Sequence, residues 1–210
     1  MIKDVTYIIN THGKYSIPLE RLLDSMSYVP KHRIIVVVAE SRVRDEILVL
    51  PNGVRMVHAD HNSFDYTGAI SLLQRPELET EPYVFFLQDT MEFGMNTDYF
   101  IRKPPIDAEA VAAFGGQCNL ALYKRSYLES KKDFILERRN LSKLESIMYE
   151  GTLWKIADHR VSYHNSTMEV QGTGNPYGGA ERIKEYYAAI DLIKWKANYG
   201  QNMNNLILHP

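Results

Sequence analysis

The stretch Tyr83-Val-Phe-Phe-Leu-Gln-Asp-Thr90 decides the fold of this 210-residue chain. Its first five residues are apolar, a pattern typical of a strand that is buried on both faces of a parallel sheet. Three similar runs precede it, at Val5–Asn10, Arg33–Ala39 and Val54–His58. Segments with helical spacing separate the four runs. The sequence therefore predicts an α/β fold with a mixed, mainly parallel sheet flanked by helices.

The spacing of apolar residues also predicts the helices and the later strands. In the first half, helices are expected after Ser16, around Val43 and Ile47, and over Ala69–Leu73. In the second half, strands are expected at Val111–Phe114, Cys118–Tyr123 and Val161–His164, and helices at Ser126–Leu136 and Ser142–Ile156. Ile183, Tyr187, Ile190, Lys194 and Ala197 predict a final helix, and the glycine-rich stretch Gly172–Gly179 before it predicts a lid loop.

Polar residues follow each of the four strands predicted in the first half. They are Thr11–Gly13, Glu40-Ser41, Asp60–Ser63 and Asp89. In open α/β sheets, ligands bind outside the carboxyl ends of the strands. The four polar segments are therefore expected to surround one crevice.

Composition narrows the class of protein. The 24 basic and 26 acidic residues give a net charge of −2. The sequence therefore lacks the excess of positive charge that is typical of proteins that bind nucleic acid. No apolar run is long enough to span a membrane. A single cysteine and an opening Met1-Ile2-Lys3-Asp4 that leads directly into a strand predict a cytoplasmic protein without a signal peptide. No linker divides the chain, so a single domain over residues 1–210 is expected.

In this order, the segments resemble glycosyltransferases of the GT-A fold, particularly the large inverting family (family 2-like). The similarity covers residues 4–165, from the Thr-His-Gly turn through Gly68-Ala69 and Gln88-Asp89-Thr90 to Gly115–Arg125. It implies a nucleotide-sugar donor such as a UDP-sugar, a glycan or other hydroxyl acceptor, and a divalent cation, Mn²⁺ or Mg²⁺. Residues 1–100 would form the nucleotide-sugar-binding half, and residues 101–210 the acceptor half with a C-terminal lid loop and helix.

The resemblance also implies roles for the strand-end residues. Thr11 and Glu40 would line the nucleoside pocket, Asp60 would lie beside the base, and Asp89 would face the metal and the sugar phosphate. His12 lies by the same crevice and is a further candidate for nucleotide-sugar binding.

The Asp-x-Asp motif of the family is replaced here by Gln88-Asp89-Thr90, which has one carboxylate. Either the metal is held by fewer protein ligands, or cationic side chains replace it in part. His164, at the end of a predicted strand, is a candidate to complete the metal shell. Arg182, after the glycine-rich loop, is a candidate for binding the diphosphate.

An inverting transfer needs a general base near the acceptor hydroxyl. Glu145 lies where the family has its base, and Glu150 and Asp133 are alternatives. Ser142-x-x-Glu145 is equally a capping box, in which the glutamate serves only the backbone. The sequence leaves both interpretations open.

Two other functions fit the same fold. One is a non-catalytic module that binds a nucleotide or a carbohydrate and has lost the second metal carboxylate. The other is a sugar-phosphate nucleotidyltransferase, which is disfavoured because Thr11-His-Gly-Lys14 lacks the glycine-rich, arginine-containing loop of those enzymes. The oligomeric state is left open.

Overall fold

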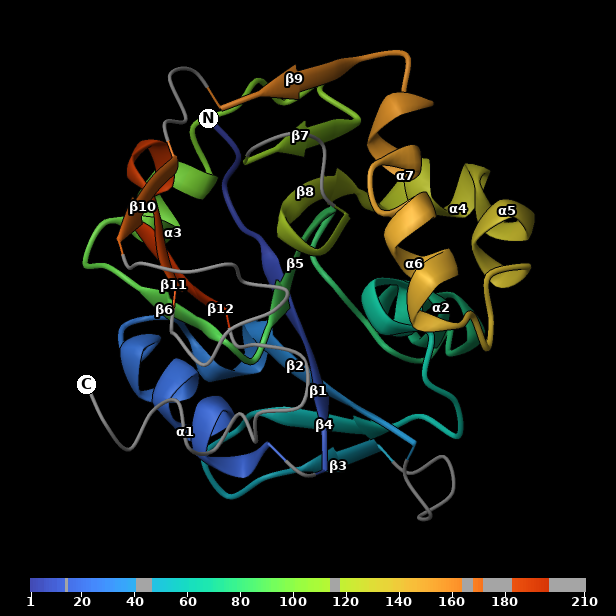
Figure 1. The fold of residues 1–210 in the computed structure, drawn as a ribbon, viewed down its shortest axis with the longest axis horizontal. Coiled ribbons are helices and arrows are strands. Elements are labelled where there is room, and N and C mark those ends of the chain that lie inside the picture. The colour runs from blue at the N-terminus through green and yellow to red at the C-terminus, as the bar shows by residue number, and fades with distance from the viewer. Residues whose placement is uncertain (14, 41–46, 114–117, 164–167, 172–182, 197–210) are drawn as a thin grey trace.

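The central element of the fold is an eight-stranded sheet with the strand order β3-β4-β2-β1-β5-β8-β7-β9 (Figure 1). The structure is a computed structural model that describes residues 1–13, 15–40, 47–113, 118–163, 168–171 and 183–196. Strand β1 pairs in parallel with both β2 and β5, and β2 pairs in parallel with β4. The predicted α/β fold with a mixed, mainly parallel sheet is confirmed. The strands are β1 (Thr6–His12), β2 (Ile34–Ala39), β3 (Ile47–Val49), β4 (Arg55–His58), β5 (Tyr83–Gln88), β7 (Ala110–Ala112), β8 (Ala121–Lys124) and β9 (Arg160–Ser162).

The alternation of side chains along β1 produces a core on each face of the sheet. Ile9 packs in one core together with Leu22 of α1, whereas Ile8 packs in the other together with Ile70 of α2. Burying such an aliphatic side chain contributes about 1.5–3 kcal/mol. The helices are α1 (Ser16–Ser25), α2 (Thr67–Gln74), α3 (Thr97–Ile101), α4 (Arg125–Ser130), α5 (Lys132–Leu136), α6 (Lys143–Tyr149) and α7 (Thr152–Lys155), with 3-10 turns η1 (Lys31–Arg33), η2 (Phe64–Tyr66), η3 (Cys118–Leu120) and η4 (Ala188–Ile190).

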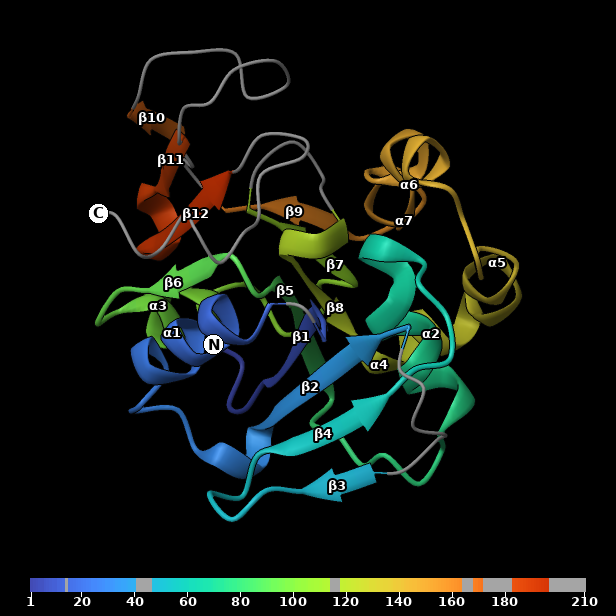
Figure 2. The same ribbon diagram turned by 60° about the horizontal axis from the view of Figure 1, so that its bottom comes forward.

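A second, smaller sheet has the order β10-β11-β12-β6, and all its pairs are antiparallel. It lies on one side of β1 and β5, and α4–α7 lie on the other side (Figures 1 and 2). The two groups of elements therefore flank the central strands. The strands of this small sheet are β6 (Met91–Phe93), β10 (Met168–Gln171), β11 (Ile183–Tyr187) and β12 (Leu192–Lys196).

The prediction of a final helix over Ile183–Ala197 is wrong, because residues 183–196 form β11, η4 and β12. Glu185 and Tyr187 are buried and Tyr186 between them is partly exposed, which is the period of two of a strand. Asp191 has a left-handed backbone, with φ 52°, and turns the chain from η4 into β12. The lid loop at 172–179 lies outside the described residues.

Smaller differences concern element boundaries. Ile47 belongs to strand β3 instead of a helix, and Val43 lies outside the described residues. The helix predicted over Ser126–Leu136 is divided into α4 and α5, and the one over Ser142–Ile156 is divided into α6 and α7. The strand predicted to end at His164 is β9, which ends at Ser162. The division into a donor half and an acceptor half stays a prediction.

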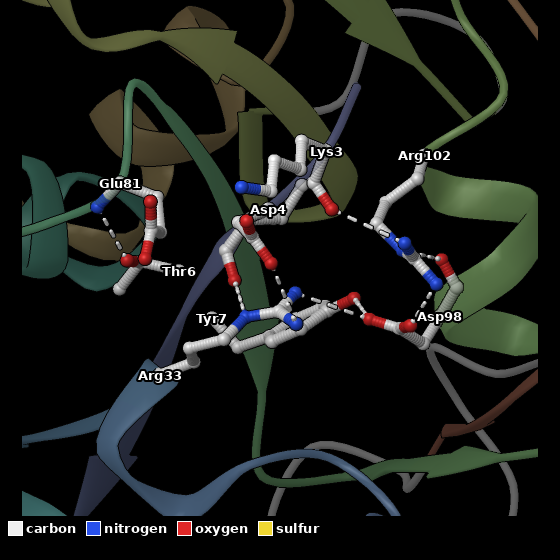
Figure 3. A network of polar contacts seen from close by, with 9 residues as sticks. Lys3, Asp4, Thr6, Tyr7, Arg33, Glu81, Asp98 and Arg102 are labelled. Atoms are coloured by element: carbon white, nitrogen blue, oxygen red, sulfur yellow. Dashed lines mark hydrogen bonds and ion pairs between the residues drawn. The ribbon is translucent and has the colours of Figure 1, made fainter. Parts of the chain in front are cut away.

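A polar network holds α3 against the amino ends of β1 and β2 (Figure 3). Asp98 of α3 accepts a hydrogen bond from the Tyr7 hydroxyl at 2.6 Å, and it pairs with Arg33 at 3.2 Å and Arg102 at 2.8 Å. Asp4 lies 3.6 Å from the Arg33 guanidinium. Burial and the charge of Asp98 raise the pKa of Tyr7 well above its ordinary value, so the hydroxyl stays a donor. One carboxylate thus neutralises a buried arginine and fixes a buried tyrosine.

Replacing Asp98 with alanine is expected to destabilise the protein by about 3 kcal/mol, because it leaves the buried Arg33 guanidinium without its nearest carboxylate. The free energy of unfolding in urea measures the effect. Asp133→Ala, at an exposed position of α5, is the control and should change that free energy by less than about 0.5 kcal/mol. Equal stability of the two variants would contradict the role of this network.

Candidate functional site

Four of the predicted nucleotide-binding residues come together at the carboxyl edge of the central sheet. Thr11 and His12 end β1, Glu40 follows β2, and Asp89 follows β5. Thr11 Oγ1 donates a hydrogen bond of 2.6 Å to Asp89 Oδ2. His12 Nε2 lies 2.9 Å from Glu40 Oε2. The parallel pairing of β1 with both neighbours brings these residues, distant in sequence, to one edge.

Asp89 is a buried carboxyl group, with 6% of the residue exposed. Burial raises the pKa of Asp89 to about 6, and the Thr11 hydrogen bond and the charge of His12 oppose this increase. The group therefore titrates near neutral pH. Its charged form, desolvated and held by the Thr11 hydroxyl and by backbone hydrogen bonds at His12 and Asp89, would gain from a cation brought by a ligand.

A second polar cluster lies on the opposite face of the sheet, next to η2 and η3. Asp65 Oδ1 accepts hydrogen bonds from Gln88 Nε2 at 2.9 Å and from Asn119 Nδ2 at 2.8 Å. Asp65 is 5% exposed and Asn119 is 2% exposed. The sequence analysis missed both residues. The one signal available was the polar segment ahead of Gly68-Ala69, which gives no direction for any of its side chains.

Buried amide atoms without a protein partner adjoin this second cluster. They are Nδ2 and Oδ1 of Asn10 and Oδ1 of Asn119. A Cβ on Gly68 would lie 2.6 Å from Asn10 Oδ1, so glycine is what allows α2 to pack this close to the end of β1. Buried polar atoms of this kind usually bind an ordered water or a ligand.

Asp60 lies apart from these clusters, in an ion pair with Arg139. Both carboxylate oxygens of Asp60 are 2.6 Å from Arg139 Nη2. Next to it, the Asn140 amide donates to Ser63 Oγ at 2.9 Å. Asp60 therefore fastens the segment after α5 to the strand-end loop, and about half of its side chain is exposed at the rim.

Glu145 is occupied by the backbone of its own helix. Its Oε2 accepts hydrogen bonds of 2.7 Å from both the amide and the hydroxyl of Ser142, whose Oγ in turn accepts from the Glu145 amide at 3.3 Å. These bonds lower the pKa of Glu145. The capping-box interpretation is confirmed, and the base role of Glu145 stays a prediction.

Glu150 caps the carboxyl end of α6. Tyr66, the neighbour of Asp65, donates a hydrogen bond of 3.0 Å to the carbonyl of Tyr149 and so holds this end of α6 at η2. The charge of Glu150 also contributes to the raised pKa of Tyr187 in β11, after burial and Glu185. The third candidate base, Asp133, is exposed on α5.

The residues described here do not supply a complete metal shell. Asp89 is the one carboxylate in the predicted position, and no group of three or more His, Cys, Asp or Glu side chains in the described ranges could hold a metal ion. His164 and Arg182, the remaining candidates for metal and diphosphate binding, lie outside the described residues.

A cavity of about 340 Å³ lies at the opposite, amino-terminal edge of the sheet. Its two arginines already serve the fold, because Arg33 pairs with Asp98, and Arg55 donates to the carbonyls of His32 and Glu79. This cavity is therefore a weaker candidate than the carboxyl edge. Its lining residues are Thr6, His32, Arg33, Arg55, Glu79, Thr80 and Glu81.

No protein-family model and no curated protein matches the sequence. Among solved structures, the chain is similar to TarS residues 1–349 from S. aureus, with 13% identity and a TM-score of 0.51 over 74% of this chain and 57% of that one. The glycosyltransferase GlyE from Streptococcus pneumoniae TIGR4 matches with 14% identity and a TM-score of 0.44, over 76% of this chain and 45% of that one. The apo form of GlyE matches with 15% identity and a TM-score of 0.42, over 76% of this chain and 45% of that one.

At 13% identity, the likeness to TarS concerns the fold alone. The chain spans little more than half of the TarS structure and less than half of GlyE. In the part of the chain that the structure describes, no helix is long and apolar enough to cross a membrane.

The raised pKa of Asp89 predicts a pH-dependent stability. Because its pKa is about 6 in the folded protein and 3.8 ordinarily, folding favours the protonated form. The resulting stabilisation is complete below about pH 4 and is lost as the pH rises through about 6. Asp89→Asn keeps an acceptor for Thr11 and does not titrate.

The free energy of unfolding of the wild type minus that of Asp89→Asn is therefore expected to fall by up to about 3 kcal/mol between about pH 4 and pH 7. Urea denaturation of both proteins across this range measures the difference. A difference that stays constant with pH would show that Asp89 is solvated in the folded protein.

Proposed function

We propose that the protein is a glycosyltransferase that moves a sugar from a nucleotide-diphosphate-sugar, such as a UDP-sugar, to a hydroxyl of a glycan acceptor. The observation that carries the proposal is the buried Asp89, held by Thr11 beside the His12–Glu40 pair at the carboxyl edge of the sheet. The similarity of the fold to glycosyltransferase structures supports it. The single cysteine is consistent with work in the reducing cytoplasm.

The donor would lie across the ends of β1, β2 and β5. Glu40 accepts a hydrogen bond from a hydroxyl of the ribose or an N–H of the base, and His12, 2.9 Å away, orients that carboxylate. Asp60 belongs to the rim near the base and keeps its ion pair with Arg139. The diphosphate lies near Asp89, and Arg182 is a further cation for it.

The reaction is a single displacement at the anomeric carbon, which inverts its configuration. The acceptor hydroxyl gives its proton to a carboxylate, its oxygen forms the new glycosidic bond, and the bond to the phosphate oxygen breaks with both electrons leaving on the nucleoside diphosphate. We assign the proton acceptor to Glu150, because Glu145 caps α6 and Asp133 is exposed on α5.

A divalent cation, Mn²⁺ or Mg²⁺, would supply positive charge to the departing diphosphate. Asp89 is the described carboxylate available to it, and His164 is the other residue we propose for it. The proposal does not depend on the cation, because cationic side chains supply charge of the same sign.

Sugar-nucleotide binding tests the proposal directly. UDP-, GDP- and dTDP-sugars, each with and without Mn²⁺, are screened by thermal shift and then assayed for release of nucleoside diphosphate. We expect one donor to raise the melting temperature and to be turned over. Asp89→Ala is expected to lose turnover at least about 100-fold, because it removes the carboxylate that would hold a cation at the diphosphate. Binding without turnover in the wild type would instead indicate a non-catalytic module.

The choice of base gives a separate prediction. Glu150→Gln should lower kcat at least about 100-fold with little change in donor affinity, because it removes the proton acceptor and keeps the shape of the side chain. Glu145→Gln should keep most of the activity and leave the stability of α6 nearly unchanged, because glutamine also completes a capping box. Steady-state kinetics and urea denaturation of both variants measure this. The opposite pattern would return the base role to Glu145.

A further inference from the structure

Helix α6 turns its apolar side away from the protein. Leu144 and Met148 are each 70% exposed and Ile147 is 45% exposed, whereas the polar Ser146 is fully buried. The three apolar residues follow the spacing i, i+3, i+4, so they form one stripe along the helix, the apolar stripe. In a helix that packs on the core of its own chain, such a stripe faces inward. The apolar stripe is therefore a surface for a partner outside the chain.

Contacts at both ends of α6 fix this orientation. Ahead of the helix, the Asn140 amide donates a hydrogen bond of 2.9 Å to Ser63 Oγ. At its other end, the Tyr66 hydroxyl donates to the Tyr149 carbonyl at 3.0 Å. To bury the apolar stripe, α6 would have to rotate by about half a turn, because a helix has 3.6 residues per turn. That rotation would break these bonds, so the stripe stays outward.

Exposed apolar surface continues at the end of α7. Ile156, the residue that ends α7, is 36% exposed, and the exposed Lys155 precedes it. Figure 1 shows α6 and α7 one after the other on the same side of the molecule. Four of the eleven exposed large hydrophobic side chains in the described residues thus lie within residues 144–156. Single exposed apolar residues are ordinary on a protein surface, whereas a cluster of them marks an interaction site.

The segment that carries the apolar stripe is positively charged. Residues 138–160 contain five Lys or Arg and three Asp or Glu, a net charge of +2 in a chain whose net charge is −2. Neither Lys143 nor Lys155 pairs with a carboxylate in the part of the chain that the structure describes. Apolar residues on one face of a helix with lysines beside them are typical of helices that lie on an anionic lipid surface.

A second copy of the chain fits this surface less well than a membrane does. Each partner in a standard interface contributes about 800 Å² and about 20–30 residues. The apolar stripe lies on a helix of seven residues, about 10 Å long. Pairing of two copies about a two-fold axis would also bring two positively charged segments together. A lipid surface attracts that charge, and it needs no matching shape.

We propose that α6 docks the protein on a membrane surface that contains anionic phospholipids. Leu144, Ile147 and Met148 enter the boundary between the headgroups and the acyl chains, and Lys143 and Lys155 lie at the level of the phosphates. Docking brings the carboxyl edge of the central sheet close to the membrane, because α6 is held against η2. The inference goes beyond the proposed function and does not rest on it.

Flotation with phospholipid vesicles tests the inference. The wild type is expected to float with vesicles of phosphatidylcholine and phosphatidylglycerol. Leu144→Gln combined with Met148→Gln should lower the partition coefficient at least about tenfold, because two apolar side chains no longer enter the bilayer. Lys143→Gln combined with Lys155→Gln should lower it at least about fivefold with these vesicles. The lysine variant should bind vesicles of phosphatidylcholine alone as the wild type does.

The matched control is Val49→Gln combined with Met95→Gln. Val49 in β3 is 69% exposed, and Met95, between β6 and α3, is 88% exposed. These elements lie on other sides of the molecule from α6 (Figure 1). The control removes as much exposed apolar surface as the stripe variant does, and it should change the partition coefficient by less than about twofold. All the residues replaced are at the surface, and urea denaturation checks that each variant is folded.

Three results would overturn the inference. The first is a wild-type protein that stays with the soluble fraction in the presence of the mixed vesicles. The second is a stripe variant that floats as well as the wild type, or a control variant that loses as much binding as the stripe variant. The third is a wild type that does not float but forms a dimer in analytical ultracentrifugation that the stripe variant does not form. That result would assign the apolar stripe to a second copy of the chain.

Discussion

The candidate site depends on the parallel pairing of β1 with both β2 and β5. Parallel strands end at the same edge of a sheet, so residues 11, 40 and 89 become neighbours although they are distant in sequence. The Asp89 amide donates to the carbonyl of Asn10 at 3.2 Å, which continues this pairing one residue beyond β5. The Asp89 side chain then reaches Thr11 at 2.6 Å. The position, burial and pKa of the carboxyl group follow from that register.

How much of the fold could be predicted depended on the range of the interactions. β1, β2 and β5 are long apolar runs whose burial is visible in the local pattern, and they were predicted correctly. The small sheet β10-β11-β12-β6 was not predicted. β6 has three residues and pairs with β12, about a hundred positions later, and the apolar spacing over Ile183–Ala197 is equally typical of a helix. Only tertiary pairing decides between the two structures there.

The same limit applies to individual side chains. The clustering of Thr11, Glu40 and Asp89 follows from the sheet topology and was predicted from the strand ends. The contact of Asp65 with Gln88 was not predicted, because no local sequence pattern gives the direction of a side chain in a 3-10 turn. Ser142-x-x-Glu145 was ambiguous because a glutamate in this position can serve as a cap or as a base. The hydrogen-bond geometry confirms the cap, and the base role stays a prediction.

The alternation of side chains explains why an amide at position 88 suits this site. Gln88 belongs to the face that packs on α2 and donates to Asp65, whereas Asp89 belongs to the other face with Thr11. A carboxylate at position 88 would lie within hydrogen-bond distance of Asp65, and one of the two acids would have to hold a proton. The chain therefore keeps one acid on each face, supplied by different segments. Because these acids do not converge, they do not concentrate negative charge for a cation as a paired motif does.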